Sequence, residues 1–532
     1  MLLDRPDGAM GRGGREDLVF YCLAFAAVGL LYLLVFADVP IYGDAWGYGY
    51  NCSRWISENG MPLLPSGAGR GESAGGHAAF YFWMWGGLMR LLGDTVAVAH
   101  LLPAIFAFLT VAGSYRLGRE LSGRTLGVFA GATVLASPLF LAQAFRALPI
   151  SAAMAATVWS LLLYRQKRYV AAAGLCVFAV MMREQALLLA LSYVAAELIG
   201  RDDRSWRRIA LLAVPVLVPV VNGLSNYLVN GYVLPAGNTP GFDQPFSLGL
   251  LLHRLKFFGF FLVGDLRWLP ISIGSGVVLG RAAGRRAGVS AAVILGLLGA
   301  FSRFTNYFVV ALIITLALAA AAGRHRLNRT GLVLVLFPLL TILSFSVIVF
   351  LTATRMEFMF LRYLMPAFPA LVAAMLWPLT GLGPRGRGLL VVFLIGTAAF
   401  NLSVRNSINY SDSTLAGYLM PLRAVQEAGV WAAETGLPVA AAGVAPRHFE
   451  NPALGYSDTA LTVVGIWDVP DHLLDRELAI VVPPTLPWGN DGDALLAEFL
   501  RGTGAEERLV LAHTVRKGPF TAVCYILRAR GR

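Results

Sequence analysis

The chain has 532 residues, of which 57% are hydrophobic and only 14% are charged, and its mean hydropathy is +0.65. Soluble globular proteins carry about 25% charged residues, so this composition excludes an ordinary soluble protein. The net charge of +12 is spread over short loops between apolar runs, which argues against a nucleic-acid partner and for Lys and Arg residues that set membrane orientation.

Apolar runs of roughly 15 to 25 residues predict a polytopic helical membrane protein. In chain order, we expect about thirteen spans with the N-terminus on the cytoplasmic side, at approximately 18–37, 95–115, 125–143, 150–164, 169–182, 185–200, 209–229, 256–280, 288–302, 305–322, 331–353, 363–380 and 388–402.

One amphipathic run, HAAFYFWMWGGLMRLLG from His77, is not among these spans. If 77–92 crossed the membrane, the basic loop at Arg116–Arg124 and every later basic loop would move to the outer side, against the usual bias. The run is also short and rich in aromatic residues that suit an interface. We therefore predict a juxtamembrane helix on the outer surface, within an external loop over 38–94.

The composition changes after residue 402. The segment 403–532 carries more charge, a helical pattern at 422–436, and five short β-like runs separated by Gly, Pro and Asp: LPVAAAGV, LTVVGI, LAIVVPP, LVLAHTV and FTAVCYIL. We expect residues 1–402 to form an all-α transmembrane domain and 403–532 a compact extracytoplasmic α/β domain. Cys52 and Cys524 would then both face outward, which leaves a disulfide between them open.

Asp44, in IYGDAWGYGYNCSRWISENG, follows the first span by a few residues. A carboxylate at the wet edge of a membrane cavity could take a proton from an acceptor hydroxyl as that hydroxyl attacks. Asp44 would equally make a good helix N-cap, and the sequence leaves both readings open. Asp38, at the end of the span, is interpreted as an interfacial boundary residue.

Several basic residues are predicted at the outer ends of spans. His77, with Arg90, could meet a phosphate or could simply end a loop at the interface. Arg146, and the neighbours Arg183 and Glu184, occupy depths where ionisable groups are expensive and tend to line cavities. Arg183 and Glu184 could instead pair with each other.

The segment TRMEFMFLRYLMPAFPAL holds Arg355, Glu357, Arg362 and Tyr363. Arginine binds phosphate through a planar fork of donors, and a helix that starts near Tyr363 adds a favourable positive end for an anion. Alternatively, these arginines have no ligand, and their side chains simply extend to the membrane interface to keep the charge in water. Arginines on the outer face oppose the positive-inside bias, which favours a functional role.

Over about 15–400, the chain resembles membrane glycosyltransferases of the GT-C fold, in the branch of protein mannosyltransferases and lipid A aminoarabinose transferases. The resemblance rests on five segments, in this order: GDAWGYGYNCSRWISENG, HAAFYFWMWGGLMRLLG, YRLGRELSGR, ASPLFLAQAFRALPIS and FLRYLMPAFPAL. The sequence departs from the pattern at Ala45, at Ala78 and Ala79, and at Pro149, where the family often carries an acid, two prolines and another acid.

The resemblance implies inverting transfer of a sugar from a polyprenyl phosphate to an acceptor hydroxyl at the outer face of the cytoplasmic membrane. Asp44 would be the base, and His77, Arg362 with Tyr363, Arg183 and Arg355 would hold the donor phosphate. Arg146 and Glu184 would line the cavity.

Such a reaction would not require a cofactor, because a phosphate neutralised by cations is a good leaving group, and the sequence leaves open whether a divalent metal takes part. There is no P-loop, no dinucleotide motif and no DxD pair in the outer loops. The expected partners are a polyprenyl-phosphate sugar donor, an acceptor that is lipid, glycan or protein, and membrane lipids. The alternatives are a transporter or flippase of a lipid-linked sugar, which usually shows paired repeats and broken helices, and a non-catalytic scaffold.

Overall fold

The computed structural model describes residues 12–41, 45–62, 80–200, 204–231, 233, 248–263, 268–323, 327–351, 361–403, 415–442, 449, 451–457, 460–484, 492–517 and 519–529. Three of the candidate residues, Asp44, His77 and Arg355, lie outside these ranges.

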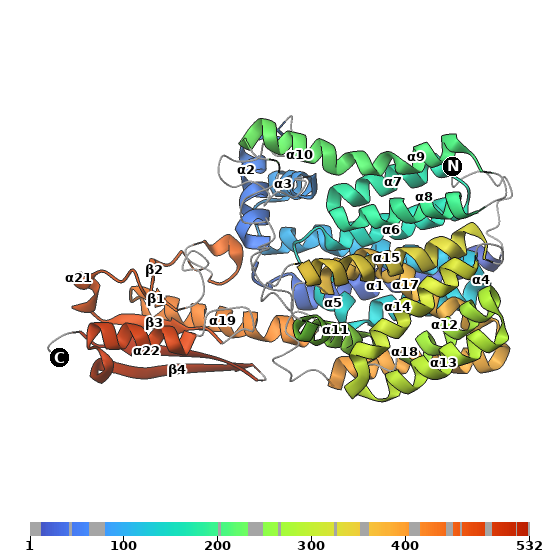
Figure 1. Cartoon of the computed structure of the whole chain (residues 1–532). Coiled ribbons are helices and arrows are strands. Elements are labelled where there is room, and N and C mark those ends of the chain that lie inside the picture. The colour runs from blue at the N-terminus through green and yellow to red at the C-terminus, as the bar shows by residue number, and fades with distance from the viewer. Residues whose placement is uncertain are drawn as a thin grey trace.

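The larger part of the molecule is a bundle of long helices that lie alongside one another (Figure 1). Five described stretches are long and apolar enough to cross a membrane: Gly14–Phe36, Val96–Ala136, Trp206–Val229, Thr305–Ala322 and Arg362–Thr380. The helices of this part are α1 (Arg12–Leu31, continued by the π-helical turn η1, Tyr32–Phe36), α4 (Val96–Ala136), α5 (Pro138–Ala144), α6 (Ile150–Arg165), α7 (Tyr169–Met182), α8 (Leu187–Ile199), α9 (Trp206–Ala213), α10 (Leu217–Asn230), α11 (Leu248–Val263), α12 (Trp268–Ala283), α13 (Arg285–Ala300), α14 (Thr305–Ala322), α15 (Arg329–Leu351), α16 (Leu361–Leu364), α17 (Phe368–Thr380) and α18 (Gly383–Ser403).

Helix α4 is a tight hairpin of two helices. Its 41 residues would extend about 60 Å if straight, about twice the thickness of a bilayer core. The backbone leaves helical geometry at Ser122 and Gly123, where Gly123 adopts a φ of 80°. The halves pack so closely that a Cβ atom on Gly118 would lie 2.9 Å from the Leu126 carbonyl oxygen. The two helices expected at 95–115 and 125–143 are therefore both present.

The span expected at 256–280 overlaps two described helices. Helix α11 is described up to Val263 and α12 from Trp268, and residues 264–267 between them lie outside the described ranges. Helix α11 packs against α14 and α15, whereas α12 packs mainly against α13. Helix α11 also begins at Leu248, eight residues before the expected start.

The segment after the first helix forms η2 (Ala45–Tyr50), α2 (Asn51–Asn59) and α3 (Phe80–Leu92). Figure 1 shows α2 and α3 running across the direction of the long helices, at the end of the bundle nearest the C-terminal domain. Helix α3 packs on α2 and on α4, and it buries Tyr81, Phe82 and Trp85. This arrangement supports a helix over 77–92 that does not add a crossing.

The C-terminal part is an α/β domain. Its sheet has the order β2-β1-β3-β5-β4, in which β1 is parallel to β2 and β3, while β5 is antiparallel to β3 and β4. All five runs expected to be strands are strands: β1 (Val439–Ala441), β2 (Val463–Gly465), β3 (Leu478–Val482), β4 (Leu509–Lys517) and β5 (Phe520–Leu527). The helices are α19 (Leu415–Thr435), α21 (Asp471–Leu474) and α22 (Gly492–Thr503). Cys52 and Cys524 are both buried, and no disulfide joins them.

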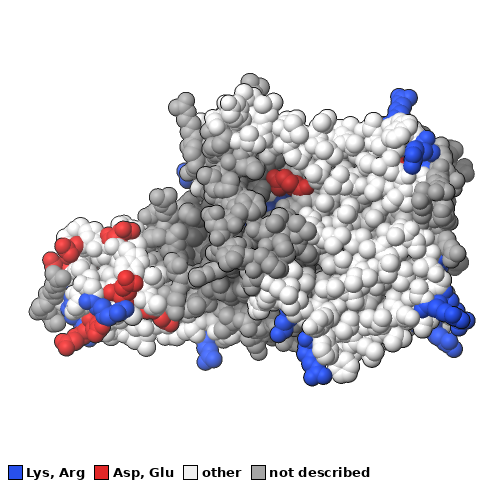
Figure 2. Space-filling view, in the orientation of Figure 1, with Lys and Arg blue, Asp and Glu red and all other residues white. Residues whose placement is uncertain are grey.

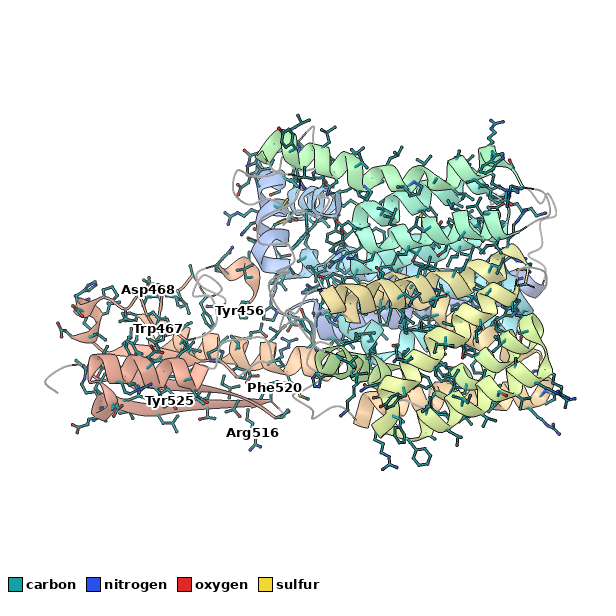
Figure 3. All side chains as sticks on the ribbon, in the orientation of Figure 1. Tyr456, Trp467, Asp468, Arg516, Phe520 and Tyr525 are labelled. Carbon is teal, nitrogen blue, oxygen red and sulfur yellow. The ribbon has the colours of Figure 1, made fainter. Side chains whose placement is uncertain are left out.

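Helix α19 connects the two parts of the molecule. It packs on β3, β4 and β5 of the sheet and also on α5 of the bundle. Figure 1 shows it running from the sheet to the end of the bundle, and Figure 3 shows side chains filling the space between α19, α22 and the strands. The domain is thus held at one end of the helices, beside the segment that carries η2, α2 and α3.

Candidate active site

Two of the predicted arginines lie beside short 3-10 segments that adjoin longer helices. Arg183 follows the end of α7 in an extended conformation (φ −149°, ψ 123°), before the short 3-10 helix η3 (Glu184–Ala186). Arg362 lies in the single turn α16, before the 3-10 helix η8 (Met365–Ala367) and α17. Pro366 and Pro369 disfavour one continuous helix here because each lacks an N–H donor.

The structure brings these two arginines together on one aromatic ring. The guanidinium carbon of Arg362 lies 5.3 Å from the centroid of the Tyr363 ring, and that of Arg183 lies 5.5 Å from the same centroid. Both arginine residues are only 6% exposed. The turns η3 and η8 pack against each other, and Thr157 of α6 donates a hydrogen bond of 2.8 Å to the Pro366 carbonyl oxygen. The pair is therefore held by three helical segments.

Such a pair suits a phosphate. Charges at this burial are costly to desolvate, and the negative face of an aromatic ring offsets only part of that cost. A phosphate oxygen accepts strong charge-assisted hydrogen bonds from guanidinium groups. Glu184, beside Arg183, begins η3 and is half-buried, so one carboxylate adjoins this basic position.

Arg146 lies in a different setting. It follows α5, its Nε donates to the Ala142 carbonyl oxygen at 2.9 Å, and the residue is 7% exposed. Its guanidinium carbon lies 4.0 Å from the ring centroid of Tyr418 on α19. A helix that leads into the C-terminal domain thus covers a buried arginine of the bundle.

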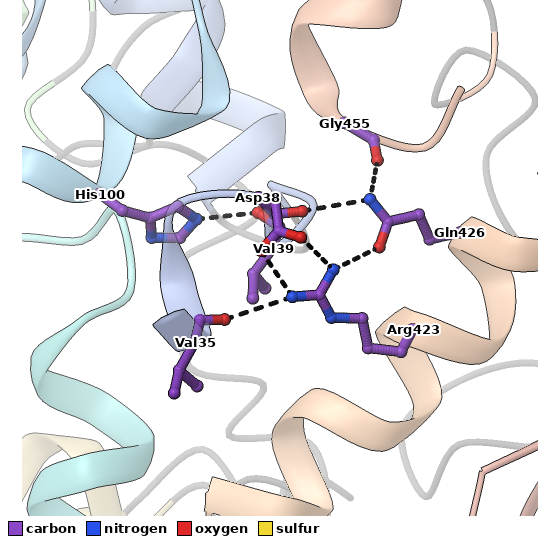
Figure 4. A network of polar contacts seen from close by, with 7 residues as sticks. All are labelled: Val35, Asp38, Val39, His100, Arg423, Gln426 and Gly455. Carbon is purple, nitrogen blue, oxygen red and sulfur yellow. Dashed lines mark hydrogen bonds and ion pairs between the residues drawn. The ribbon is translucent and has the colours of Figure 1, made fainter. Parts of the chain in front are cut away.

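Asp38 is part of the contact between the bundle and α19 (Figure 4). Its Oδ1 and Oδ2 accept hydrogen bonds from Arg423 Nη2 and Nη1 at 2.6 and 2.8 Å. Gln426 donates to the Asp38 carbonyl oxygen at 3.1 Å and to the Gly455 carbonyl oxygen at 2.9 Å. The Arg423 hydrogen bonds lower the pKa of the Asp38 carboxyl, which makes this carboxylate a poor general base. The interpretation of Asp38 as a boundary residue is thereby refined.

The C-terminal domain also contacts the chain on both sides of residues 42–44. On one side, the Ile41 N–H donates to the Leu454 carbonyl oxygen at 2.9 Å. On the other, Asn451 Nδ2 donates to the Tyr50 hydroxyl at 3.0 Å, and that hydroxyl donates to Asp94 Oδ2 at 2.6 Å. Burial, with the hydrogen bond to Asp94, raises the pKa of Tyr50 to about 12, so Tyr50 stays protonated and keeps donating. The segment that holds Asp44 is therefore anchored at both ends.

These anchors could not be predicted from the sequence. Asp38 and Arg423 are 385 residues apart, and nothing local links them. Tyr418 and Asn451 carry no motif either. Among the residues that the structure describes, no group of three or more His, Cys, Asp or Glu could hold a metal ion.

A family model described as dolichyl-phosphate-mannose-protein mannosyltransferase matches residues 76–223. The resemblance to protein mannosyltransferases is thus confirmed for this segment, which contains His77, Arg146, Arg183 and Glu184 and ends before Arg362. No curated protein sequence matches the chain.

Solved structures align with most of the chain at low identity. ArnT from Cupriavidus metallidurans in the apo state is 16% identical with a TM-score of 0.40, and the alignment covers 95% of this chain and 98% of that chain. The same protein bound to undecaprenyl phosphate gives the same values. The Archaeoglobus fulgidus oligosaccharyltransferase in complex with Zn and sulfate is 15% identical with a TM-score of 0.46, and the alignment covers 88% of this chain and 68% of that chain.

Proposed function

We propose that this protein is an inverting glycosyltransferase of the GT-C type, which moves a sugar from a polyprenyl phosphate to an acceptor hydroxyl at the outer face of the cytoplasmic membrane. The observation that carries the proposal is the buried pair Arg183 and Arg362 on the Tyr363 ring. The family match over 76–223 adds the donor class, because that family is named for a polyprenyl-phosphate sugar.

In this proposal, the two arginines hold the donor phosphate. As the bond between the anomeric carbon and the phosphate oxygen breaks, the electron pair goes to that oxygen and the polyprenyl phosphate leaves. Guanidinium groups that are already in place stabilise this growing charge without reorganisation, so protonation of the leaving group is not needed. His77 and Arg355 are proposed to complete the phosphate site, with Arg146 and Glu184 lining the cavity.

Asp44 is proposed as the general base. Its carboxylate takes the proton of the acceptor hydroxyl, and the hydroxyl oxygen forms a bond to the anomeric carbon from the face opposite the phosphate, which inverts that carbon. The anchors at Ile41 and Tyr50 support this role, because a base must be held within hydrogen-bond reach of its proton. Asp38 is the poorer candidate because Arg423 already occupies both of its oxygens.

The Asp44→Asn variant tests the proposal. General-base catalysis contributes about 10²- to 10⁴-fold to rate, so release of polyprenyl phosphate from synthetic C55-polyprenyl-phosphate-linked hexoses and pentoses should fall by at least about a hundredfold. The measurement is mass spectrometry of purified protein with membrane extract supplying acceptors. Asp38→Asn is the matched control and should retain most of the turnover.

Near-normal turnover by a folded Asp44→Asn protein would refute the assignment of the base. A wild-type protein that moves the labelled donor across a liposome membrane, yet never releases polyprenyl phosphate, would instead establish the transporter alternative.

A further inference from the structure

A cavity of about 660 Å³ lies at the start of α7. Helix α7 ends at the arginine pair, so its start lies at the opposite end of the bundle, away from the C-terminal domain (Figure 1). The cavity is formed by the turn before α7 and the first turns of α7 and α9: Lys167, Arg168, Tyr169, Val170, Ala171, Ser205, Arg207, Arg208 and Leu211. It therefore has no part in the site described above.

Its lining is strongly basic. Four of its nine residues are Lys or Arg, and among the residues that the structure describes, no carboxylate lines it. Arg208 is partly neutralised, because its Nε donates to Glu197 Oε2 at 2.8 Å and its guanidinium carbon lies 5.1 Å from the Tyr169 ring centroid. Glu197 is fully buried and also lies 3.5 Å from Arg329 Nε. One carboxylate thus serves two arginines, while Asp202 and Asp203, which precede Ser205 in the sequence, lie outside the described residues.

Two helix N-termini meet at the same cavity. Helix α7 starts at Tyr169 after its N-cap Arg168, and α9 starts at Trp206 after its N-cap Ser205, whose hydroxyl accepts from the Arg208 N–H at 3.4 Å. The first turn of a helix presents N–H groups and a partial positive charge, which favour a bound anion. The starts of these two helices add partial positive charge beside the four basic side chains, while the C-terminal end of α6 before Lys167 adds partial negative charge.

Lys167 forms the turn at the C-terminus of α6 in an unusual backbone conformation. Its N–H bonds to the Tyr164 carbonyl oxygen at 3.0 Å and the Arg168 N–H bonds to that of Leu163 at 2.9 Å, which is the pattern of a helix C-terminus that normally takes glycine. Lys167 has a φ of 60°, and it is the one non-glycine residue with positive φ in the described part of the chain. A side chain in this conformation is strained. Replacement of Lys167 by glycine would therefore relieve the backbone and remove one cation from the lining of the cavity.

Exposed apolar side chains adjoin the basic residues. Val170 is 74% exposed and Trp206 is 68% exposed, next to Arg168 and Arg207 respectively. Tryptophan favours the headgroup level of a membrane, and basic residues cluster on the cytoplasmic side. Figure 2 shows Lys and Arg gathered at this end of the bundle. We propose that the cavity binds the phosphate of an anionic phospholipid headgroup from the cytoplasmic leaflet.

The Lys167→Gly variant gives a sharp test. It removes one charge from the cavity while relieving the positive φ, so a binding role and a folding role predict opposite effects. In native mass spectrometry of the full-length protein, we expect affinity for dioleoylphosphatidylglycerol to fall about fivefold per cation removed. The thermal midpoint in detergent without added lipid should stay the same or rise. The double variant Arg168→Gln/Arg207→Gln should lose about twentyfold or more.

Arg286→Ala is the matched control. Arg286 is an exposed arginine in the first turn of α13, and the charge pattern places this turn on the same side of the membrane as the cavity. Equal loss of lipid by Arg286→Ala and Lys167→Gly would overturn the proposal, as would unchanged binding by both cavity variants. In the wild-type protein, equal retention of dioleoylphosphatidylglycerol and dioleoylphosphatidylcholine would also overturn it. Full displacement of the lipid by millimolar inorganic phosphate would assign a soluble anion instead and reject the lipid.

Discussion

Tyr363 is the residue through which the candidate site is organised, because both buried guanidinium groups lie over its ring. The π-system of this ring attracts each cation, and both guanidinium carbons lie within 5.5 Å of the ring centroid. A phosphate that binds there meets donors whose positions are already set, so little ordering entropy is lost on binding.

Arg362→Ala should weaken the binding of C55-polyprenyl phosphate about tenfold to a hundredfold, because a hydrogen bond to a charged group contributes about 1.5–3 kcal/mol. Native mass spectrometry or fluorescence titration of the purified protein measures this without knowledge of the sugar. Arg362→Lys keeps the charge but loses the planar fork of donors. Its affinity for C55-polyprenyl phosphate should lie between those of the wild-type and Arg362→Ala proteins. Equal affinity of the wild-type and Arg362→Ala proteins would rule out the phosphate role.

The Tyr363 ring itself can be tested with two variants. Tyr363→Phe keeps the aromatic face and should bind polyprenyl phosphate almost as well as the wild type. Tyr363→Leu removes that face and should bind several-fold less tightly, since cation–π contacts contribute about 0.5–2 kcal/mol. If both variants bind equally weakly, the hydroxyl rather than the ring carries the effect.

At the scale of elements, α19 determines how the C-terminal domain meets the bundle. Three features of this contact converge on the chain around residues 42–44: Arg423 on Asp38, Leu454 on Ile41, and Asn451 on Tyr50. Gly455 completes it, because a Cβ atom there would lie 2.7 Å from Val96 Cγ2 and its φ is 82°. We infer that the domain positions the loop that carries the proposed base.

The ion pair of Asp38 and Arg423 predicts a pH dependence for this contact. The folded pKa of Asp38 lies below its usual value, so its contribution is present above that usual value and is lost as the pH falls through the folded pKa. Protease resistance of the C-terminal domain should therefore decline below about pH 4 in the wild type. Because the Asp38 side chain is 66% exposed, the contribution should be at most about 1 kcal/mol.

Arg423→Gln serves as the control for that pH profile. It should weaken the contact at neutral pH and remove the Asp38-linked part of the decline, because Asp38 would then titrate near its usual pKa in both states. A wild-type and an Arg423→Gln protein with identical profiles would show that the ion pair does not hold the domain.

At the scale of the whole molecule, the distribution of charge predicts the orientation. Basic residues occur in the loops at one end of the bundle, and the α/β domain lies at the other end (Figures 1 and 2). The positive-inside bias then places the domain outside the cytoplasm. Alkaline phosphatase fused after residue 529 should be active and green fluorescent protein at the same place dark. The opposite pattern would put the proposed active site on the cytoplasmic side.

Much of the architecture was predictable because it depends on patterns along the chain. Apolar runs of membrane length predicted the helices, and alternating short runs bounded by Gly and Pro predicted all five strands of the sheet. Helix bounds were less predictable, since α11 begins at Leu248 and the expected span began at 256. Arg183 was chosen for its depth, because charges near a membrane edge are expensive. Arg362 and Tyr363 were chosen because an arginine at the start of a helix on the outer face suits a phosphate.

Composition and periodicity were enough to predict an apolar helical bundle with a polar α/β domain, because hydrophobic burial follows from both. They also identified the residue types that could bind a phosphate. Which of these residues meet became clear from the three-dimensional structure: Arg183 and Arg362 share one ring, Arg146 lies under Tyr418, and Asp38 is bound by an arginine 385 residues away. Contacts between distant segments depend on how helices pack, and packing is not written in any local pattern.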